Sequence, residues 1–215
     1  MKIKKAIVIV GLLISFTSIF FTQEKQVEKN STITCQQILN YISKKQNSTG
    51  AFEQIRLVKT ESMERKFVTT GDFLFCPKGI VLWSQKPFKN TTVLTPSYVK
   101  NILPNGKQNV TGDNPGFENI ARIFIGIFGG DLNIIEENFV HEFGVQGNRW
   151  HLSLEPTNSA IKNAILNINL FGTFSETDAE LTGYTLIQNG NVQTTFNFSQ
   201  IAYPQSLSEE QNALF

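Results

Sequence analysis

Apolar and polar residues alternate over residues 71–88, in two runs that a Pro-Lys-Gly turn separates. Phe73 and Phe75 belong to the first run, and the second run ends at Trp83. Alternation with a period of two, broken by Pro and Gly, is typical of two antiparallel strands. Pro87 should end the second strand, because proline has no backbone N–H for the ladder. We therefore predict that Phe73, Phe75 and Trp83 face the concave side of one sheet.

The same alternation predicts strands along most of the chain, with Gly, Pro and Asn at the turns between them. In the first half the expected strands are 51–59, 65–75, 80–84, 91–94, 98–103 and 107–111. In the second half they form two hairpins, 139–154 and 184–199, which turn at Gly147-Asn148 and Asn189-Gly190. Residues 156–171 fit both a turn of helix and a strand, and the tail 208–215 fits both a short helix and a frayed end.

Two segments show helical periodicity instead. Residues 32–45 have an apolar stripe at i, i+3, i+4 and i+7, which consists of Cys35, Ile38, Leu39 and Ile42. A second helix should begin with Asn114 as N-cap and Pro115 at its first position, and end near Phe128 before two glycines. The second helix is apolar almost all round, so it must be buried or face something apolar. Both a plain core helix and a helix that closes a cavity fit this pattern.

The hairpin at 139–154 can be read residue by residue. With a two-residue turn, Val145 lies opposite Trp150, Phe143 opposite Leu152, and His141 opposite Leu154. One face is then apolar, and it consists of Phe139, Phe143, Val145, Trp150, Leu152 and Leu154.

The chain has two histidines, and this register places them on opposite faces of the hairpin. His141 lies at the edge of the apolar face, and His151 lies on the other face. The separation argues against a shared metal site and against histidine-based catalysis. We expect His141 to be a hydrogen-bonded packing residue.

The sequence also has no Gly-x-Ser-x-Gly, no phosphate-binding loop and no cluster of metal ligands. We expect no catalytic residue, no metal and no cofactor.

The N-terminus has the pattern of an export signal. Residues 1–22 begin with three lysines and continue with an apolar run, which predicts a secretory signal peptide, with a retained membrane anchor as the alternative. Residues 23–31 are polar and read as a linker, and 32–215 suit a single domain. Three of the 19 basic residues lie in the signal, which leaves 16 against 18 acidic residues. With no basic tract, nucleic acid is not an expected partner.

The order of several motifs resembles the LolA-like family of lipoprotein carriers. A glycine-led strand, a proline turn, a tryptophan-containing strand and a second proline run from Gly71 to Pro87, and Phe52-Glu53-Gln54 stands upstream. Gly130-Asp131-Leu132, Phe139 and the segment from Trp150 to Pro156 resemble one branch of that family. The resemblance implies an α+β fold, with a strongly curved antiparallel sheet (an incomplete β-barrel) and helices covering its concave side. Cys76 stands where the family usually has a basic residue, most often arginine, that closes its lid.

The resemblance also implies a function. The chain would be an exported carrier in the periplasm of a Gram-negative envelope, and it would bind acyl chains of lipoproteins or another lipid. Its partners would be an inner-membrane exporter complex and an outer-membrane receptor, and the carrier would be a monomer. The expected lipid-binding residues are Phe73, Phe75, Trp83, Phe124, Phe128, Phe139, Phe143, Trp150 and Leu152. The alternative is an envelope sensor or protein-interaction module that uses the same concave sheet. Phenylalanine is abundant, at 18 residues, which fits an ordinary core as well as a lipid cavity.

Cys35 and Cys76 are the only cysteines. In an oxidising envelope two cysteines are a candidate disulfide. Because Cys76 occupies the position of the family's arginine, a Cys35–Cys76 bond would attach the first helix to the sheet in its place. The alternative is two buried free thiols that act as small hydrophobic residues.

Overall fold

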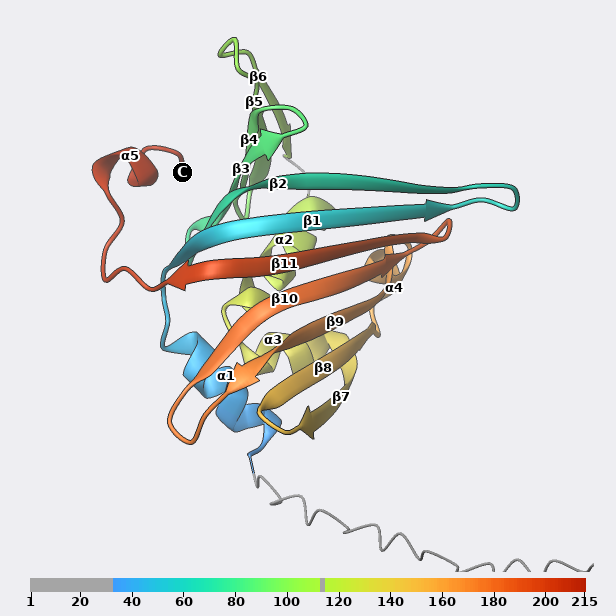
Figure 1. The fold of residues 1–215 in the computed structure, drawn as a ribbon, viewed down its shortest axis with the longest axis vertical. Coiled ribbons are helices and arrows are strands. Elements are labelled where there is room, and N and C mark those ends of the chain that lie inside the picture. Colours follow the sequence, from blue (N-terminus) through green and yellow to red (C-terminus); the bar gives the residue numbers. More distant parts are fainter. Residues whose placement is uncertain (1–32, 113–114) are drawn as a thin grey trace, which may run out of the picture. The chain divides into compact units, whose positions relative to one another are not determined.

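The described part of the chain, residues 33–112 and 115–215 of a computed structural model, contains one sheet of eleven antiparallel strands (Figure 1). The strands are β1 (Ser48–Lys59), β2 (Glu64–Cys76), β3 (Gly79–Lys86), β4 (Asn90–Leu94), β5 (Tyr98–Ile102), β6 (Gln108–Gly112), β7 (Phe139–Gln146), β8 (Arg149–Pro156), β9 (Ile165–Phe174), β10 (Ala179–Gln188) and β11 (Val192–Ala202). The predicted signal peptide (1–22), the linker (23–31) and the Asn114 cap lie outside the described residues.

Each strand of the sheet pairs with its neighbour in the sequence, except where β1 pairs with β11. That one pairing joins the block β1–β6 to the block β7–β11. β6 and β7 lie at the two edges, so the sheet stays open. The prediction of a curved antiparallel α+β fold is confirmed.

The described residues form five helices, α1 (Cys35–Ser43), α2 (Pro115–Phe128), α3 (Leu132–Asn138), α4 (Ser159–Lys162) and α5 (Glu209–Asn212). Thr34 begins α1 with a capping box, in which its hydroxyl accepts from the Gln37 N–H and the Gln37 side chain accepts from the Thr34 N–H. The sequence did not predict α3, which Asp131 caps by accepting from the N–H groups of Asn133 and Ile134. None of these helices is long and apolar enough to span a membrane.

Helices α1, α2 and α3 lie together on one side of the sheet, behind it in Figure 1. We call this side of the sheet the inner face. Ile38 and Leu39 of α1, Ile127 of α2 and Ile135 of α3 are almost fully buried there, in one hydrophobic core with the strands. The predicted apolar stripe of the first helix is therefore the stripe that packs on the sheet.

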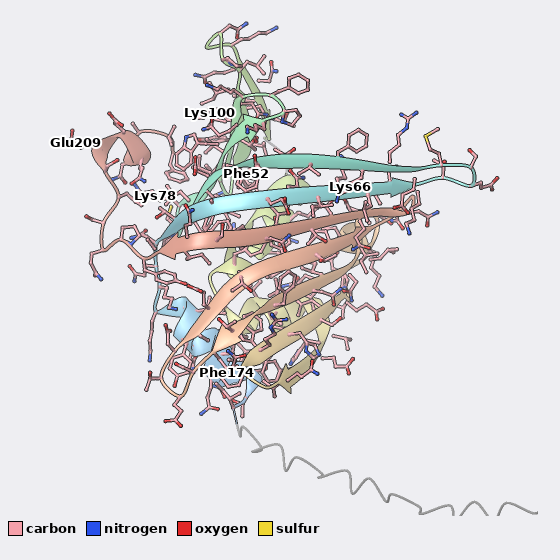
Figure 2. The ribbon with its side chains drawn as sticks, viewed as in Figure 1. Phe52, Lys66, Lys78, Lys100, Phe174 and Glu209 are labelled. Carbon is pink, nitrogen blue, oxygen red and sulfur yellow. The ribbon has the colours of Figure 1, made fainter. Side chains whose placement is uncertain are left out.

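A smaller core lies on the opposite, outer face of β2, β3 and β4. It is formed by Leu74, Val81 and Val93, which are fully buried, and by Cys76. The C-terminal segment 207–215 packs over it through Leu207, Leu214 and Phe215. The ammonium groups of Lys78 and Lys100 donate to the Asn212 side chain (2.8 Å) and to the Leu214 carbonyl oxygen (2.7 Å), and both lysines are labelled in Figure 2. Because segment 207–215 covers this outer core, strands β2–β4 bury apolar side chains on both faces.

The position of Trp83 corrects one prediction. Phe73 lies opposite Leu82 in the β2–β3 pairing, whereas Trp83 lies opposite Asp72. Because neighbouring side chains of a strand point to opposite faces, Trp83 faces outward and packs against the smaller core. Phe73 and Phe75 face inward as predicted. The prediction for Trp83 was wrong because β3 is apolar on both faces, so its composition does not reveal its phase.

Candidate hydrophobic binding site

Aromatic rings cover the centre of the inner face and contact one another from strand to strand. We call this set the aromatic layer; it consists of Phe52, Phe73, Phe75, Tyr184, Phe196 and Phe198. Ring centroids lie 4.9 Å apart for Phe73 and Phe75, 4.7 Å for Phe73 and Phe198, and 4.8 Å for Tyr184 and Phe196. Such distances are in the range in which aromatic pairs attract beyond their burial. The layer is a continuous apolar surface across four adjacent strands.

The register of the strands explains how the layer forms. Phe52 lies opposite Phe198 on β11 and opposite Gly71 on β2. Gly71 must lack a side chain, because a Cβ there would overlap the carbonyl oxygen of Trp83. Phe73 lies opposite Gly50, whose own missing side chain leaves room for the Phe73 ring. Gly50 thus gives the Phe73 ring its space, and Gly71 allows the backbone of β3 to approach β2 closely.

Helix α2 covers the aromatic layer through its own phenylalanines. The Phe128 ring is stacked on Phe75, with planes 1° apart and centroids at 5.4 Å, and it meets Tyr184 at 4.6 Å. Phe124 lies 6.2 Å from Phe128 along the helix. Ile123 and Ile127 are buried on the same side of α2. Of the two predicted alternatives for this helix, both a core helix and a helix closing a cavity remain compatible with these contacts.

Eight of the nine predicted lipid-binding residues belong to the inner core. Phe73, Phe128, Phe139, Trp150 and Leu152 are buried in it, and Phe75, Phe124 and Phe143 pack against it partly exposed. Trp83 is the exception described above. Their lipid-binding role stays a prediction. The sequence reasoning did not include Phe52, Tyr184, Phe196 and Phe198, although the alternation of Phe196 and Phe198 with polar residues was a usable signal.

The β7–β8 hairpin has the predicted register. Val145 lies opposite Trp150, Phe143 opposite Leu152 and His141 opposite Leu154. Trp150 is 1% exposed, and its indole N–H donates to the carbonyl oxygen of Thr173 at 3.1 Å. This hydrogen bond satisfies the one polar group of a buried indole.

The two histidines lie on opposite faces, as the register requires. His141 is exposed, so the expectation of a packing residue was wrong. β7 is an edge strand, and the helices do not bury its inner face at this position. In the described part of the chain, no group of three or more His, Cys, Asp or Glu side chains is placed to hold a metal ion.

Free space remains on the inner side next to α2. A cavity of about 400 Å³ lies between the end of α1, the β2–β3 turn and α2. Phe75, Ile80, Ile125, Phe128 and Ile134 supply its apolar lining, and Lys45, Arg122 and Asp131 its charged lining. Its volume is in the usual range of ligand pockets. A second space beside the aromatic layer holds only about 30 Å³, so the layer itself is closed in this structure.

Lys45 lies at the border of both spaces and joins α1 to the loop before β10. Its ammonium group is 2.9 Å from the Asp178 carboxylate, donates to the Ala179 carbonyl oxygen at 2.7 Å, and lies 4.2 Å from the Tyr203 ring centroid. Its side chain is only 15% exposed. The Tyr203 hydroxyl in turn donates to Glu180 at 2.9 Å. Lys45 therefore attaches the end of α1 to the loop before β10 through polar contacts at the edge of the cavity.

Neither cysteine is in a disulfide. Cys35 packs on the inner core, whereas Cys76 follows the phase of Leu74 and belongs to the outer core. The proposed Cys35–Cys76 bond is contradicted, because the sheet separates the two thiols.

Burial, with a smaller effect of Glu136, raises the pKa of the Cys35 thiol to about 11. Burial also raises the pKa of Cys76, against the opposing effect of hydrogen bonds from Lys78 and Gly79. Both thiols are therefore protonated at neutral pH.

No protein-family model and no curated protein matches the chain. Among solved structures, it is similar to a LolA superfamily protein from Nitrosomonas europaea, with 8% identity over 83% of this chain and 96% of that chain, and a TM-score of 0.44. It is also similar to a protein domain from Vibrio parahaemolyticus described as outer membrane lipoprotein-sorting, with 12% identity over 84% and 99% of the chains, and a TM-score of 0.39. A DUF1329 family protein from Desulfovibrio piger matches with 9% identity over 81% and 94%, and a TM-score of 0.43.

The first two descriptions name the kind of protein that the sequence motifs resemble. All three TM-scores are below 0.5.

Proposed function

We propose that the protein is an exported, non-enzymatic carrier that binds the acyl chains of a lipoprotein or another lipid between its sheet and helix α2. It would load at an inner-membrane exporter and unload at an outer-membrane receptor, as a monomer in the periplasm. One observation supports this above all: a continuous aromatic layer on the inner face is covered by a helix that meets it through ring contacts. The motifs from Gly71 to Pro87 and from Gly130 to Pro156 resemble those of carriers with this role.

Apolar contacts of this kind can be exchanged for a lipid chain. They have no fixed direction, so an acyl chain can occupy the surface of Phe75 and Tyr184 that Phe128 covers. The cavity beside Phe75 and Phe128 provides a place for a chain to enter.

The magnitudes favour reversible exchange. Displacing α2 would expose Ile123, Ile127 and Phe128, at about 1.5–3 kcal/mol each, or roughly 5–9 kcal/mol together. Burying a chain of about ten CH₂ groups yields about 8 kcal/mol. Because the two terms are of similar size, the bound and empty states can interconvert, and a carrier needs both states to load and unload.

The experiment that tests the carrier role is lipid extraction from the protein after purification from the cell envelope. We expect lipid or lipoprotein in a fixed ratio to the wild-type protein, and loss of it in Phe128→Asp with the β-sheet circular dichroism spectrum preserved. The matched control is Phe88→Asp, because Phe88 is 81% exposed outside the inner core. Wild-type protein that carries no lipid but retains a protein partner would favour the sensor or interaction module instead.

A further inference from the structure

The inner face continues beyond the helices onto the end of the β1–β2 hairpin, which projects past the neighbouring strands (Figure 1). A groove of about 470 Å³ lies on this surface. Its lining combines four polar and two apolar side chains of the two strands: Gln54, Arg56, Val58, Arg65, Phe67 and Thr69. We call it the hairpin groove.

The register places all of these side chains on the face of the aromatic layer. Arg56 lies opposite Phe67, and Val58 lies opposite Arg65. No irregularity interrupts the β1–β2 pairing, so positions 54, 56 and 58 share the face of Phe52. The groove is thus the open extension of the inner face.

The hairpin groove contains positive charge without a counter-charge. Among the described residues, neither guanidinium forms an ion pair, and the Arg65 Nε–H donates to the Met63 sulfur at 3.0 Å. The neighbouring strand contributes Val192, Thr194 and Phe196 to this face, none of which is acidic. The acidic side chains of the two strands, Glu53, Glu64 and Asp72, belong to the other face, where Glu64 pairs with Lys59 at 3.0 Å. Glu61 lies exposed in the turn of the hairpin and forms no ion pair with a described residue.

Two arginines in this arrangement work against folding unless an anion joins them. Arg56 and Arg65 are diagonal cross-strand neighbours, about 7–8 Å apart at their Cα atoms. Like charges at that separation repel each other. Guanidinium groups bind phosphate and carboxylate through paired hydrogen bonds, and two of them on either side of one anion would turn the repulsion into binding.

The exposed Phe67 and the nearby aromatic layer indicate that the anion belongs to an amphiphile. Phe67 lies between the two arginines and is 52% exposed. Along β1, Arg56 is four residues from Phe52, or roughly 13 Å at the usual rise of a strand. Gln54, midway between them, lies opposite Phe196. A molecule with its apolar part on the layer can therefore place a headgroup in the groove.

We propose that Arg56 and Arg65 bind the phosphate headgroup of an amphiphile whose acyl chain lies on the aromatic layer. This proposal rests on the carrier function proposed above and assigns a headgroup class to its cargo. The chain supplies the apolar contact, and the arginines select molecules with an anionic head. The hairpin groove accordingly determines which lipid is carried, and the layer determines that a lipid is carried.

The test compares two amphiphiles with the same twelve-carbon chain, dodecyl phosphate and dodecyl maltoside, titrated below their micelle concentrations by calorimetry. We expect dodecyl phosphate to bind the wild-type protein about tenfold or more tightly. The double variant Arg56→Gln/Arg65→Gln should lose this preference while its affinity for dodecyl maltoside stays unchanged. The matched control is Lys59→Gln/Lys66→Gln, which removes two positive charges from the outer face of the same hairpin (Lys66 is labelled in Figure 2). It should retain the preference.

Several results would overturn the proposal. The preference for dodecyl phosphate could persist in the arginine variant. It could also fall equally in the lysine control, which would show that the preference depends on the general charge of the hairpin. Inorganic phosphate that competes as strongly as dodecyl phosphate would indicate a site for a free anion. Equal binding of both amphiphiles by the wild-type protein would contradict the headgroup site but not the carrier function. Wild-type protein that binds neither contradicts the carrier function itself.

Discussion

The Phe75 ring on β2 and the Phe128 ring on α2 are parallel to within 1°, with their centroids 5.4 Å apart. This stack joins the covering helix to the first strand block, and the contact of Phe128 with Tyr184 joins it to the second. One side chain of α2 therefore meets both halves of the sheet. If α2 moves to admit a lipid, Phe128 must leave both partners.

Phe128→Ala should accordingly make the inner face easier to open. We expect an increase in the rate at which a fluorescent fatty acid is taken up, measured by stopped-flow mixing, because the stack with Phe75 is lost. Stability should fall by about 3–5 kcal/mol, as for other buried phenylalanines. Phe139→Ala is the matched control: Phe139 is also buried but has no ring contact with the layer. It should lower stability without speeding uptake, and equal acceleration in both variants would assign the effect to general loosening.

The Lys45 contacts should stabilise the α1 end of the opening. Lys45→Met keeps the length of the side chain but removes its hydrogen bonds to Asp178 and Ala179. We expect the free energy of unfolding, from denaturant titration, to fall by about 1–3 kcal/mol, because hydrogen bonds to charged groups contribute that much. Lys44→Met, one residue earlier and exposed, should change it little. A Lys45 variant as stable as the wild type would show that the contact makes no net contribution.

The sequence was most informative where a turn fixed the register. Gly147-Asn148 is a two-residue hairpin turn, so the pairs from Val145–Trp150 to His141–Leu154 followed from counting alone. The resulting register agrees with the structure along the whole hairpin. Strand positions in the first half were found equally well, because Gly, Pro and Asn separate them. The observed ends of β2 and β3, Cys76 and Lys86, lie within two residues of those expected.

The sequence was least informative where both faces of a strand are covered. Val81 and Leu82 are both apolar because helices pack on one side of β3 and segment 207–215 packs on the other. A continuous apolar run has no phase, so Trp83 was placed on the wrong face. Cys76 was misplaced in the same way, because the outer core that contains it depends on a segment more than 130 residues later in the chain. Helix α3 was missed because its seven residues span only about two turns, too few to show a repeated apolar stripe.

The separation of the two cysteines by the sheet should be visible in their chemistry. After unfolding without reductant, titration should find two free thiols. In the native protein at pH 8, Cys35 should react with iodoacetamide on the order of a hundredfold more slowly than a free cysteine, because a pKa of about 11 lowers its thiolate fraction by that amount.

The sign of the effect on stability follows from the same shift. The folded state retains the Cys35 proton more tightly than the unfolded chain, so its contribution is complete below pH 9 and is lost as pH rises toward 11. The stability of the wild type should decrease more over this interval than that of Cys35→Ala. Parallel pH profiles for the two proteins would contradict the burial of this thiol.

Segment 207–215 should stabilise the sheet without taking part in binding. Phe215 and Leu214 pack over Leu74 and Val81 on the outer face, away from the aromatic layer. Phe215→Ala should lower the free energy of unfolding by about 1–3 kcal/mol, since the ring is only partly buried. It should also change the fluorescence of Trp83, which packs in the same cluster. Affinity for dodecyl maltoside should stay at the wild-type value, because the sheet lies between the substitution and the inner face. A loss of affinity as large as that of Phe128→Asp would mean that the two faces are coupled through β2 and β3.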